Sequence, residues 1–125
     1  MALSTDRILL AAADAVSCAG KKHLRHLDIG SGHGDLITLL RSKGLVTHSA
    51  ACDYTASLMM LPDVQVTVAN LNTEKLPFAD ASFDLVTCTE VVEHLEHYRQ
   101  TLREMHRVLA PGGKLVVTTP NILNL

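Results

Sequence analysis

Three glycines crowd one short loop, GSGHG at residues 30–34, between an apolar run and a helical pattern. Glycine adopts positive φ angles and has no side chain to block an approaching ligand. The first N–H groups of the following helix favour an anionic or oxygen-rich group. Asp28, just before the loop, would repel phosphate but attract an ammonium or sulfonium group. A tight turn alone needs only one glycine, so the pattern predicts a ligand that comes close to this backbone.

The glycine spacing separates two classes of nucleotide ligand. The dinucleotide fingerprint is G-x-G-x-x-G, whereas the third glycine of this loop, Gly34, comes one position early. Asp53 ends an apolar run about 20 residues beyond the loop, where an acidic side chain can accept hydrogen bonds from ribose hydroxyls. Together, the loop and Asp53 indicate an adenosine ligand without phosphates. A nicotinamide-dependent oxidoreductase is disfavoured by the spacing and stays an alternative.

Acidic and imidazole side chains cluster in EVVEHLEH, residues 90–97. On a helix, Glu90, Glu93 and His94 would have i, i+3 and i+4 spacing and share one face. Glu90 or His94 could then act as a general base toward a substrate. The same groups could bind a divalent metal, and the first turn of a helix favours acids through its dipole alone. We predict Glu90 and His94 as catalytic residues and predict no metal site.

The elements that must position these residues alternate between helices and strands. Apolar runs predict strands over residues 24–29, 46–52, 65–69, 83–89 and 114–119. Helical spacing predicts helices over 5–19, 34–43 and 90–109, a brief helical turn near 55–60 and a turn at 110–113. This order predicts an α/β fold with a doubly wound, open parallel sheet. Ligands of such sheets bind at the carboxyl ends of the strands, where all three motifs fall.

Composition narrows the class of protein further. The 125 residues suit one domain, and the net charge of −2 without a basic stripe gives no electrostatic case for a nucleic-acid partner. No apolar run reaches the roughly 18 residues that a membrane-spanning helix needs. The three cysteines form neither a disulfide framework nor a zinc-ligand spacing. We therefore expect a cytoplasmic protein that does not span a membrane.

Four motifs in order resemble those of class I S-adenosylmethionine-dependent methyltransferases: LDIGSGHGD, ACDYT, ANLNTEKLPFADASFDLVTCTEVVEHL and RVLAPGGKLVVTTPN. Within that superfamily the chain is most similar to small-molecule and quinone-type enzymes. The resemblance implies a Rossmann-like methyltransferase fold, S-adenosyl-L-methionine as cofactor, and methyl transfer to a small-molecule acceptor by in-line displacement at the sulfonium methyl group. The alternative in another functional class is a non-catalytic cofactor-binding module or the partner subunit of a methyltransferase.

The resemblance also implies which residues hold the methionine part of the cofactor. Three loop residues would lie against it: Gly30, Ser31 and Gly32. Asp28 would help to hold its amino group. Thr89 and Glu90, after the fourth strand, would face the methyl group and the acceptor.

A second group of residues is implied for the adenosine part. Asp53 would accept hydrogen bonds from the ribose hydroxyls, with Tyr54 beside the adenine. Asn70 and Leu71 follow the third strand, where the family often has an aspartate before an apolar residue. An asparagine carbonyl can accept a hydrogen bond from the adenine amino group, although more weakly than a carboxylate.

The resemblance covers five strands, whereas a class I methyltransferase core usually has seven. We expect residues 1–125 to form a single S-adenosylmethionine-binding domain that lacks the C-terminal antiparallel strand pair. An expression fragment, a naturally short protein and a protein completed by another chain all fit this expectation. An uncovered sheet edge invites pairing, which predicts a homodimer or a partner chain at that edge.

Overall fold

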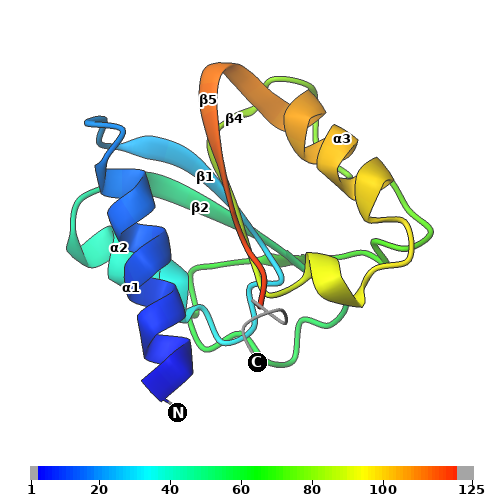
Figure 1. The fold of residues 1–125 in the computed structure, drawn as a ribbon, viewed down its shortest axis with the longest axis horizontal. Coiled ribbons are helices and arrows are strands. Elements are labelled where there is room, and N and C mark those ends of the chain that lie inside the picture. Colours follow the sequence, from blue (N-terminus) through cyan, green and yellow to red (C-terminus); the bar gives the residue numbers. More distant parts are fainter. Residues whose placement is uncertain (1–2, 121–125) are drawn as a thin grey trace.

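The computed structural model describes residues 3–120 as five strands and three α-helices (Figure 1). The strands are β1 (Leu24–Ile29), β2 (Val46–Asp53), β3 (Val66–Val68), β4 (Phe83–Thr89) and β5 (Leu109–Thr118). The helices are α1 (Leu3–Ser17), α2 (Asp35–Ser42) and α3 (Tyr98–Val108), with a single 3₁₀ turn, η1 (Val92–His94). No helix among residues 3–120 is long and apolar enough to cross a membrane.

The strands form one parallel sheet in the order β3-β2-β1-β4-β5. The chain builds outward from β1 to one edge and then returns to build toward the other, so the strand order reverses between β1 and β4. This confirms the predicted α/β fold with a doubly wound, open sheet. Within residues 3–120 the sheet contains no antiparallel strand pair.

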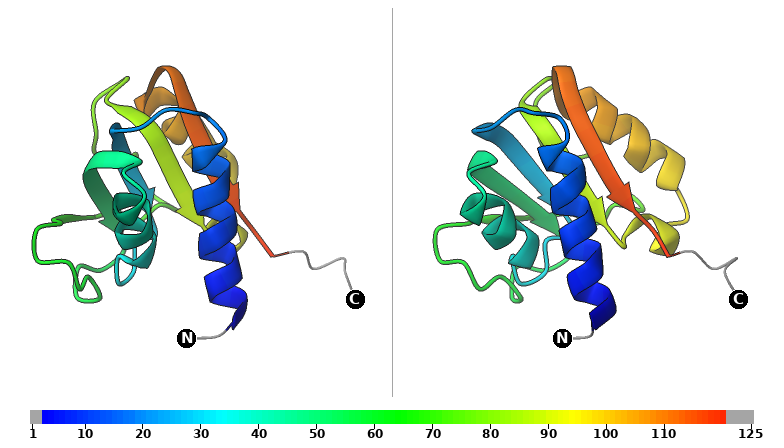
Figure 2. Two further views of the ribbon diagram at one scale, coloured as in Figure 1. Left: turned by 90° about the vertical axis from the view of Figure 1, so that its left-hand side faces the viewer. Right: turned by 60° about the vertical axis from the view of Figure 1, so that its left-hand side comes forward.

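The helices cover both faces of the sheet (Figure 2). On one face, Val16 of α1 and Leu40 of α2 pack with Leu85 of β4 in one apolar cluster. On the other face, Met105 of α3 packs with Val86 of β4 in a second cluster. Leu85 and Val86 are neighbours in sequence but serve opposite faces, because successive side chains of a strand point to opposite sides. Burial on both faces explains the apolar runs in the central strands β1 and β4, with His26, Asp28 and Thr87 as buried polar exceptions.

Three local expectations were wrong. The helix expected over residues 90–109 is broken into η1 and α3, because Leu95 is extended (φ −100°, ψ 132°) between them. The turn expected at 110–113 lies inside β5 as a wide bulge, where Leu109 and Lys114 of β5 oppose Phe83 and Leu85 of β4. The segment near residues 55–60 forms bends and turns rather than a helical turn.

Candidate functional site

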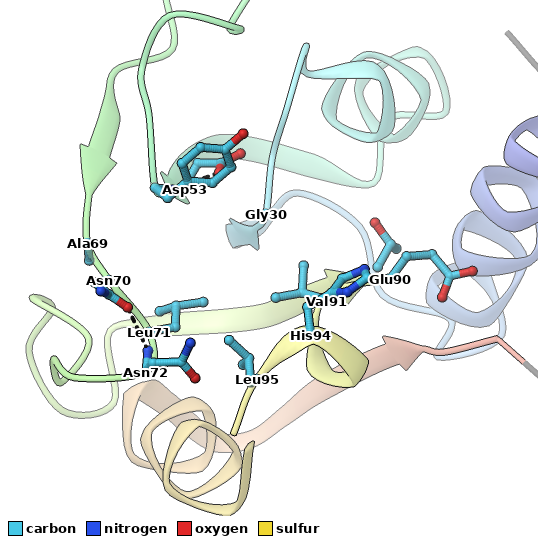
Figure 3. A pocket seen from close by; sticks show the side chains of 12 residues that line it. Gly30, Asp53, Ala69, Asn70, Leu71, Asn72, Glu90, Val91, His94 and Leu95 are labelled. Carbon is cyan, nitrogen blue, oxygen red and sulfur yellow. Dashed lines mark hydrogen bonds between the residues drawn. The ribbon is translucent and has the colours of Figure 1, made fainter. Parts of the chain in front are cut away.

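A cavity of about 430 Å³, here called the large cavity, opens where β1, β2 and β4 end (Figure 3). Its walls come from Gly30, Asp53–Tyr54, Ala69–Asn72, Thr89–Val91 and His94–Leu95. These segments are distant in sequence, but the carboxyl ends of parallel strands bring them together. The walls carry both polar side chains, such as Asp53 and Asn70, and apolar ones, such as Leu71 and Val91. The cavity therefore suits a ligand that has both an apolar part and polar groups.

A second cavity of about 330 Å³, the small cavity, adjoins it on the α1 side of the glycine loop. It is lined by Asp28, by the loop residues 30–33, and by Thr5 and Leu9 of α1. Gly30 and Thr89 line both cavities. The site therefore has two adjoining compartments, with a buried carboxylate, Asp53 or Asp28, in each.

Asp53 anchors the wall of the large cavity. Its Oδ2 accepts a hydrogen bond from the Gly32 N–H at 2.9 Å, and its Oδ1 accepts one from the Tyr54 N–H at 2.7 Å. The residue is only 7% exposed, so both oxygens are largely shielded from bulk water. A carboxylate oxygen can accept more than one hydrogen bond. Asp53 can thus fix the glycine loop and still accept two further hydrogen bonds from a ligand.

The three glycines of the loop serve different purposes. A Cβ atom on Gly30 (φ +72°) would overlap Cγ2 of Val91, and one on Gly34 (φ +92°) would lie 2.9 Å from side-chain atoms of Met59 and Leu61. These two glycines are required by packing as well as by their backbone angles. Gly32 (φ +53°) has nothing within 4 Å of its Cβ position. Of the three, Gly32 is therefore the one that leaves open space beside the small cavity.

Two buried polar groups of the small cavity call for a ligand. The Ser31 hydroxyl is buried and has no hydrogen-bond partner, and such a group normally has one. Asp28 is 2% exposed. Burial raises the pKa of its carboxyl to about 7, while the hydrogen bond from Thr87 lowers it and the charge of Asp53 raises it. A cationic ligand group beside Asp28 would stabilise its ionised form.

The segment after β4 is less regular than the loop after β1. Glu90 has φ +57°, a left-handed backbone that is uncommon for a residue with a side chain. Its Oε2 is buried without a hydrogen-bond partner. Burial raises the pKa of Glu90, and the neighbouring carboxylate of Glu93 raises it further. Glu90 is thus the more basic kind of carboxylate that can accept a proton from a substrate.

The predicted helical face of Glu90, Glu93 and His94 was wrong, because Glu90 lies before η1 in a left-handed conformation. His94 Nε2 lies 4.0 Å from Glu93 Oε2, and the His94 side chain is exposed. Among residues 3–120, no group of three or more His, Cys, Asp or Glu side chains is placed to hold a metal ion. Glu90 and His94 nevertheless both line the large cavity.

Asn70 and Leu71 line the large cavity as well, opposite the segment after β4 (Figure 3). Tyr54 is also part of its lining. Asn70 Oδ1 accepts a hydrogen bond from the Asn72 N–H at 3.0 Å, which closes a tight turn after β3. Asn72 Oδ1 in turn accepts one from the Glu96 N–H at 2.9 Å. Asn72 therefore links the two opposing walls of the cavity.

Sequence reasoning missed four residues that line the large cavity: Ala69, Asn72, Val91 and Leu95. For Asn72 the N-x-N pattern was an available signal, because asparagine side chains often hydrogen-bond the backbone two residues on. Val91 and Leu95 gave no local signal, since their placement depends on the path of the chain around η1, whereas Ala69 directly precedes the predicted Asn70.

The strand order, the glycine loop after β1 and the acid at the end of β2 are shared by dinucleotide-binding domains and class I methyltransferases. The early third glycine, Gly34, favours the methyltransferase class. The sequence model of the family described as "Methyltransferase domain" matches residues 27–117. The chain belongs to this methyltransferase family, whose cofactor is S-adenosylmethionine.

Named relatives agree with this assignment. Demethylmenaquinone methyltransferase of Deinococcus radiodurans is 32% identical over 124 residues, covering 94% of this chain and 51% of the relative. The ubiquinone/menaquinone biosynthesis C-methyltransferase UbiE of Laribacter hongkongensis is 35% identical over 111 residues, covering 82% of this chain and 46% of the relative. The chain thus spans about half the length of these curated relatives.

Solved structures share the fold. The S-adenosylmethionine-dependent methyltransferase of Mesorhizobium loti superposes with a TM-score of 0.72 at 25% identity, covering 89% of this chain and 54% of that one. The corresponding enzyme of Aquifex aeolicus gives a TM-score of 0.69 at 23% identity, covering 85% and 62%.

Proposed function

We propose that this chain binds S-adenosylmethionine along the carboxyl edge of its sheet and transfers the methyl group to a small-molecule acceptor. The observation that carries the proposal is the pair of buried carboxylates, Asp53 and Asp28, in two adjoining cavities on either side of the glycine loop. The cofactor has a neutral nucleoside at one end and a cationic amino-acid part at the other. Its two ends therefore match the two compartments.

The large cavity would take the adenosine. Asp53 would accept hydrogen bonds from both ribose hydroxyls with the acceptor sites that Gly32 and Tyr54 leave free. Leu71 and Val91 would provide apolar contacts to the adenine ring. Asn70 Oδ1 is already bonded to Asn72, and its second lone pair would accept from the adenine amino group.

The small cavity would take the methionine part. Asp28 would pair with the ammonium group, and the ammonium would in turn favour the ionised form of the buried carboxyl. The unpartnered Ser31 hydroxyl would donate to the carboxylate of the ligand. Gly32 would leave the backbone bare where the ligand passes, since nothing lies within 4 Å of its Cβ position.

When bound, the cofactor supplies a methyl group on a sulfonium centre that is already activated for displacement. The chain mainly has to align the acceptor, and alignment supplies up to about 7–11 kcal/mol of a barrier in favourable cases. Thr89 borders both cavities, so it would lie nearest the junction of the two ligand halves. Glu90 follows it, and its partly buried carboxylate would accept a proton from the acceptor, with His94 at the exposed rim.

The names of the relatives favour a quinone-like acceptor. Two of them are called demethylmenaquinone methyltransferase and ubiquinone/menaquinone biosynthesis C-methyltransferase. Leu95, an apolar residue of the large cavity that the adenosine does not use, is compatible with such an apolar ring compound. We therefore propose a small aromatic acceptor of this class.

A non-catalytic cofactor-binding module is the second candidate function. The observation beside it is the edge of β5, which within the described sheet pairs only with β4. We propose that residues 1–125 form one cofactor-binding domain and that a second copy or a partner chain pairs with β5. The cytoplasmic location expected from the cysteines stays a prediction.

Calorimetric titration with S-adenosylmethionine tests the binding step, and transfer of a labelled methyl group to demethylmenaquinone or to cell extract tests the reaction. We expect heat of binding and labelled product. Heat without product would leave only the binding module, and no heat would overturn the proposal. Asp53→Asn should weaken binding, whereas Asp63→Asn, which removes only an exposed ion-pair partner of Arg41, should not.

A further inference from the structure

A chain of hydrogen-bonded side chains runs through the sheet beneath the small cavity. Ser49 Oγ and His26 Nδ1 are 2.9 Å apart, and His26 Nε2 and Thr87 Oγ1 are 2.7 Å apart. The Thr87 hydroxyl then donates to Asp28 Oδ1 at 2.7 Å. His26 and Thr87 are fully buried and Asp28 is 2% exposed, so water cannot replace these partners.

The direction of each hydrogen bond in this chain is fixed by the state of Asp28. While Asp28 is ionised, the only proton of the Thr87 hydroxyl points to it, so Thr87 must accept from a proton on His26 Nε2. His26 Nδ1 then accepts from Ser49. When Asp28 is protonated, it can donate to Thr87, and the whole chain can reverse with the imidazole proton on Nδ1.

We propose that His26 is a positioning residue that acts through Thr87 to keep Asp28 ionised for the ammonium group of the ligand. This inference rests on the function proposed above, because Asp28 needs a cationic partner in the small cavity. His26 itself touches no cavity. It works by directing the Thr87 hydroxyl, which alone among the described hydrogen bonds donates to the Asp28 side chain.

The charges around the chain support this arrangement. Burial, aided by the positive charge of Arg41, lowers the pKa of His26 to about 3, so the ring stays neutral and has one N–H to donate. Burial also raises the pKa of the nearby Cys88 thiol to about 12, which keeps it uncharged. Burial raises the pKa of Asp28 to about 7, and the Thr87 hydroxyl opposes that rise. The titratable groups that surround the small cavity and the chain from other elements are His33, Asp35, Arg41, Cys52, Asp53, Cys88 and Glu93.

The alternative is that the chain only satisfies buried polar groups. Both roles predict some loss of stability when Thr87 is changed. The two roles differ in the pH dependence of binding. Only a role through the charge of Asp28 shifts the pH midpoint of the affinity for a ligand that carries an ammonium group.

The experiment measures binding of two probes between pH 5.5 and 8.5 by calorimetry, a range that brackets both the pKa of Asp28 of about 7 and a midpoint one unit higher. S-adenosylhomocysteine has the ammonium group, and 5′-methylthioadenosine lacks it. In the Thr87→Val variant, we expect the pH midpoint of S-adenosylhomocysteine binding to rise by about one unit. At pH 6 its affinity should then be about tenfold below that of the unaltered chain. Binding of 5′-methylthioadenosine should change less than about twofold, and Thr87→Ser, which restores the hydroxyl, should restore the profile.

Equal weakening of both probes at every pH would overturn the inference and leave a structural role. Failure of the unaltered chain to bind either probe would instead overturn the proposed function. Nuclear magnetic resonance of the unaltered, ligand-free chain gives a test that does not depend on the folding of a variant. The proton of the His26 ring should move from Nε2 to Nδ1 as the Asp28 carboxyl is protonated, and an unchanged ring across that titration would contradict the proposal.

Discussion

Two segments meet at the carboxyl edge of the sheet, and they are built differently. The loop after β1 places its left-handed backbone at glycines and is tied down by the buried carboxylate of Asp53. The segment after β4 places its left-handed backbone at Glu90 and continues into a single 3₁₀ turn. The first segment is arranged to hold a ligand in one position. The second leaves buried and exposed acid–base groups beside that position.

The largest expected effect is at Gly30, where the loop after β1 packs against Val91 of the segment after β4. Gly30→Ala forces a side chain into a positive φ and into Val91, and these two effects together should cost about 3 kcal/mol of unfolding free energy. Gly32→Ala meets the φ penalty alone and should cost about 1 kcal/mol. Urea denaturation measures both values. Equal losses would show that Val91 does not pack on Gly30.

The role of Asp53 should appear in binding rather than in folding alone. Asp53→Asn removes the charge that accepts from the Gly32 N–H and, in the proposed complex, from the ribose, so the affinity for S-adenosylmethionine should fall roughly 10- to 100-fold. His94→Gln on the opposite segment should change that affinity less than about threefold, because the His94 side chain is exposed. Calorimetry measures both affinities. A larger loss from His94→Gln would reverse the comparison.

The buried histidine of β1, His26, should make the free energy of unfolding depend on pH. The folded pKa of His26 is about 3, below its ordinary 6.5, so the unfolded chain binds the extra proton and stability is lost as pH falls below 6.5. The stability difference between the unaltered chain and His26→Phe should therefore shrink by about 2 kcal/mol from pH 7.5 to pH 5. Thermal denaturation at the two pH values checks this. A difference that stays constant would mean that His26 has the same pKa in the folded and the unfolded chain.

The smallest effect is expected at the strained residue of the second segment. Glu90→Gly relieves the positive φ and removes an unpartnered buried oxygen, so stability should rise by about 1 kcal/mol. Glu93→Gly, at a residue without a positive φ, should instead lower stability by about 0.5–1 kcal/mol.

The same pair of variants tests the proposed role of Glu90 in catalysis. Glu90→Gly should reduce methyl transfer while the affinity for the cofactor stays within about twofold. Unchanged transfer would remove Glu90 from the proposed mechanism.

The same comparison explains how much the sequence could predict. Glycine in a sequence indicates a left-handed backbone, so the loop after β1 was predictable. The apolar runs on either side of it made the sheet predictable. β1 and β4 have the predicted bounds, Leu24–Ile29 and Phe83–Thr89. All the predicted cofactor-binding residues line one of the two cavities, although their roles remain proposals.

The segment after β4 could not be predicted in the same way. Its apolar spacing is helical, yet Glu90 adopts a left-handed backbone and Leu95 is extended, and neither residue type signals a break. Tertiary contacts decide the path here, such as the hydrogen bond from the Glu96 N–H to Asn72, which joins residues 24 positions apart. The buried chain from His26 to Asp28 was invisible for the same reason, since it depends on which strands lie side by side.

A crystal structure of the chain with S-adenosylhomocysteine tests the central claim most directly. The account predicts both ribose hydroxyls within about 3 Å of the Asp53 carboxylate and the ligand ammonium group in the small cavity beside Asp28. A ligand bound elsewhere, or an Asp53 side chain turned away from the ribose, would contradict it.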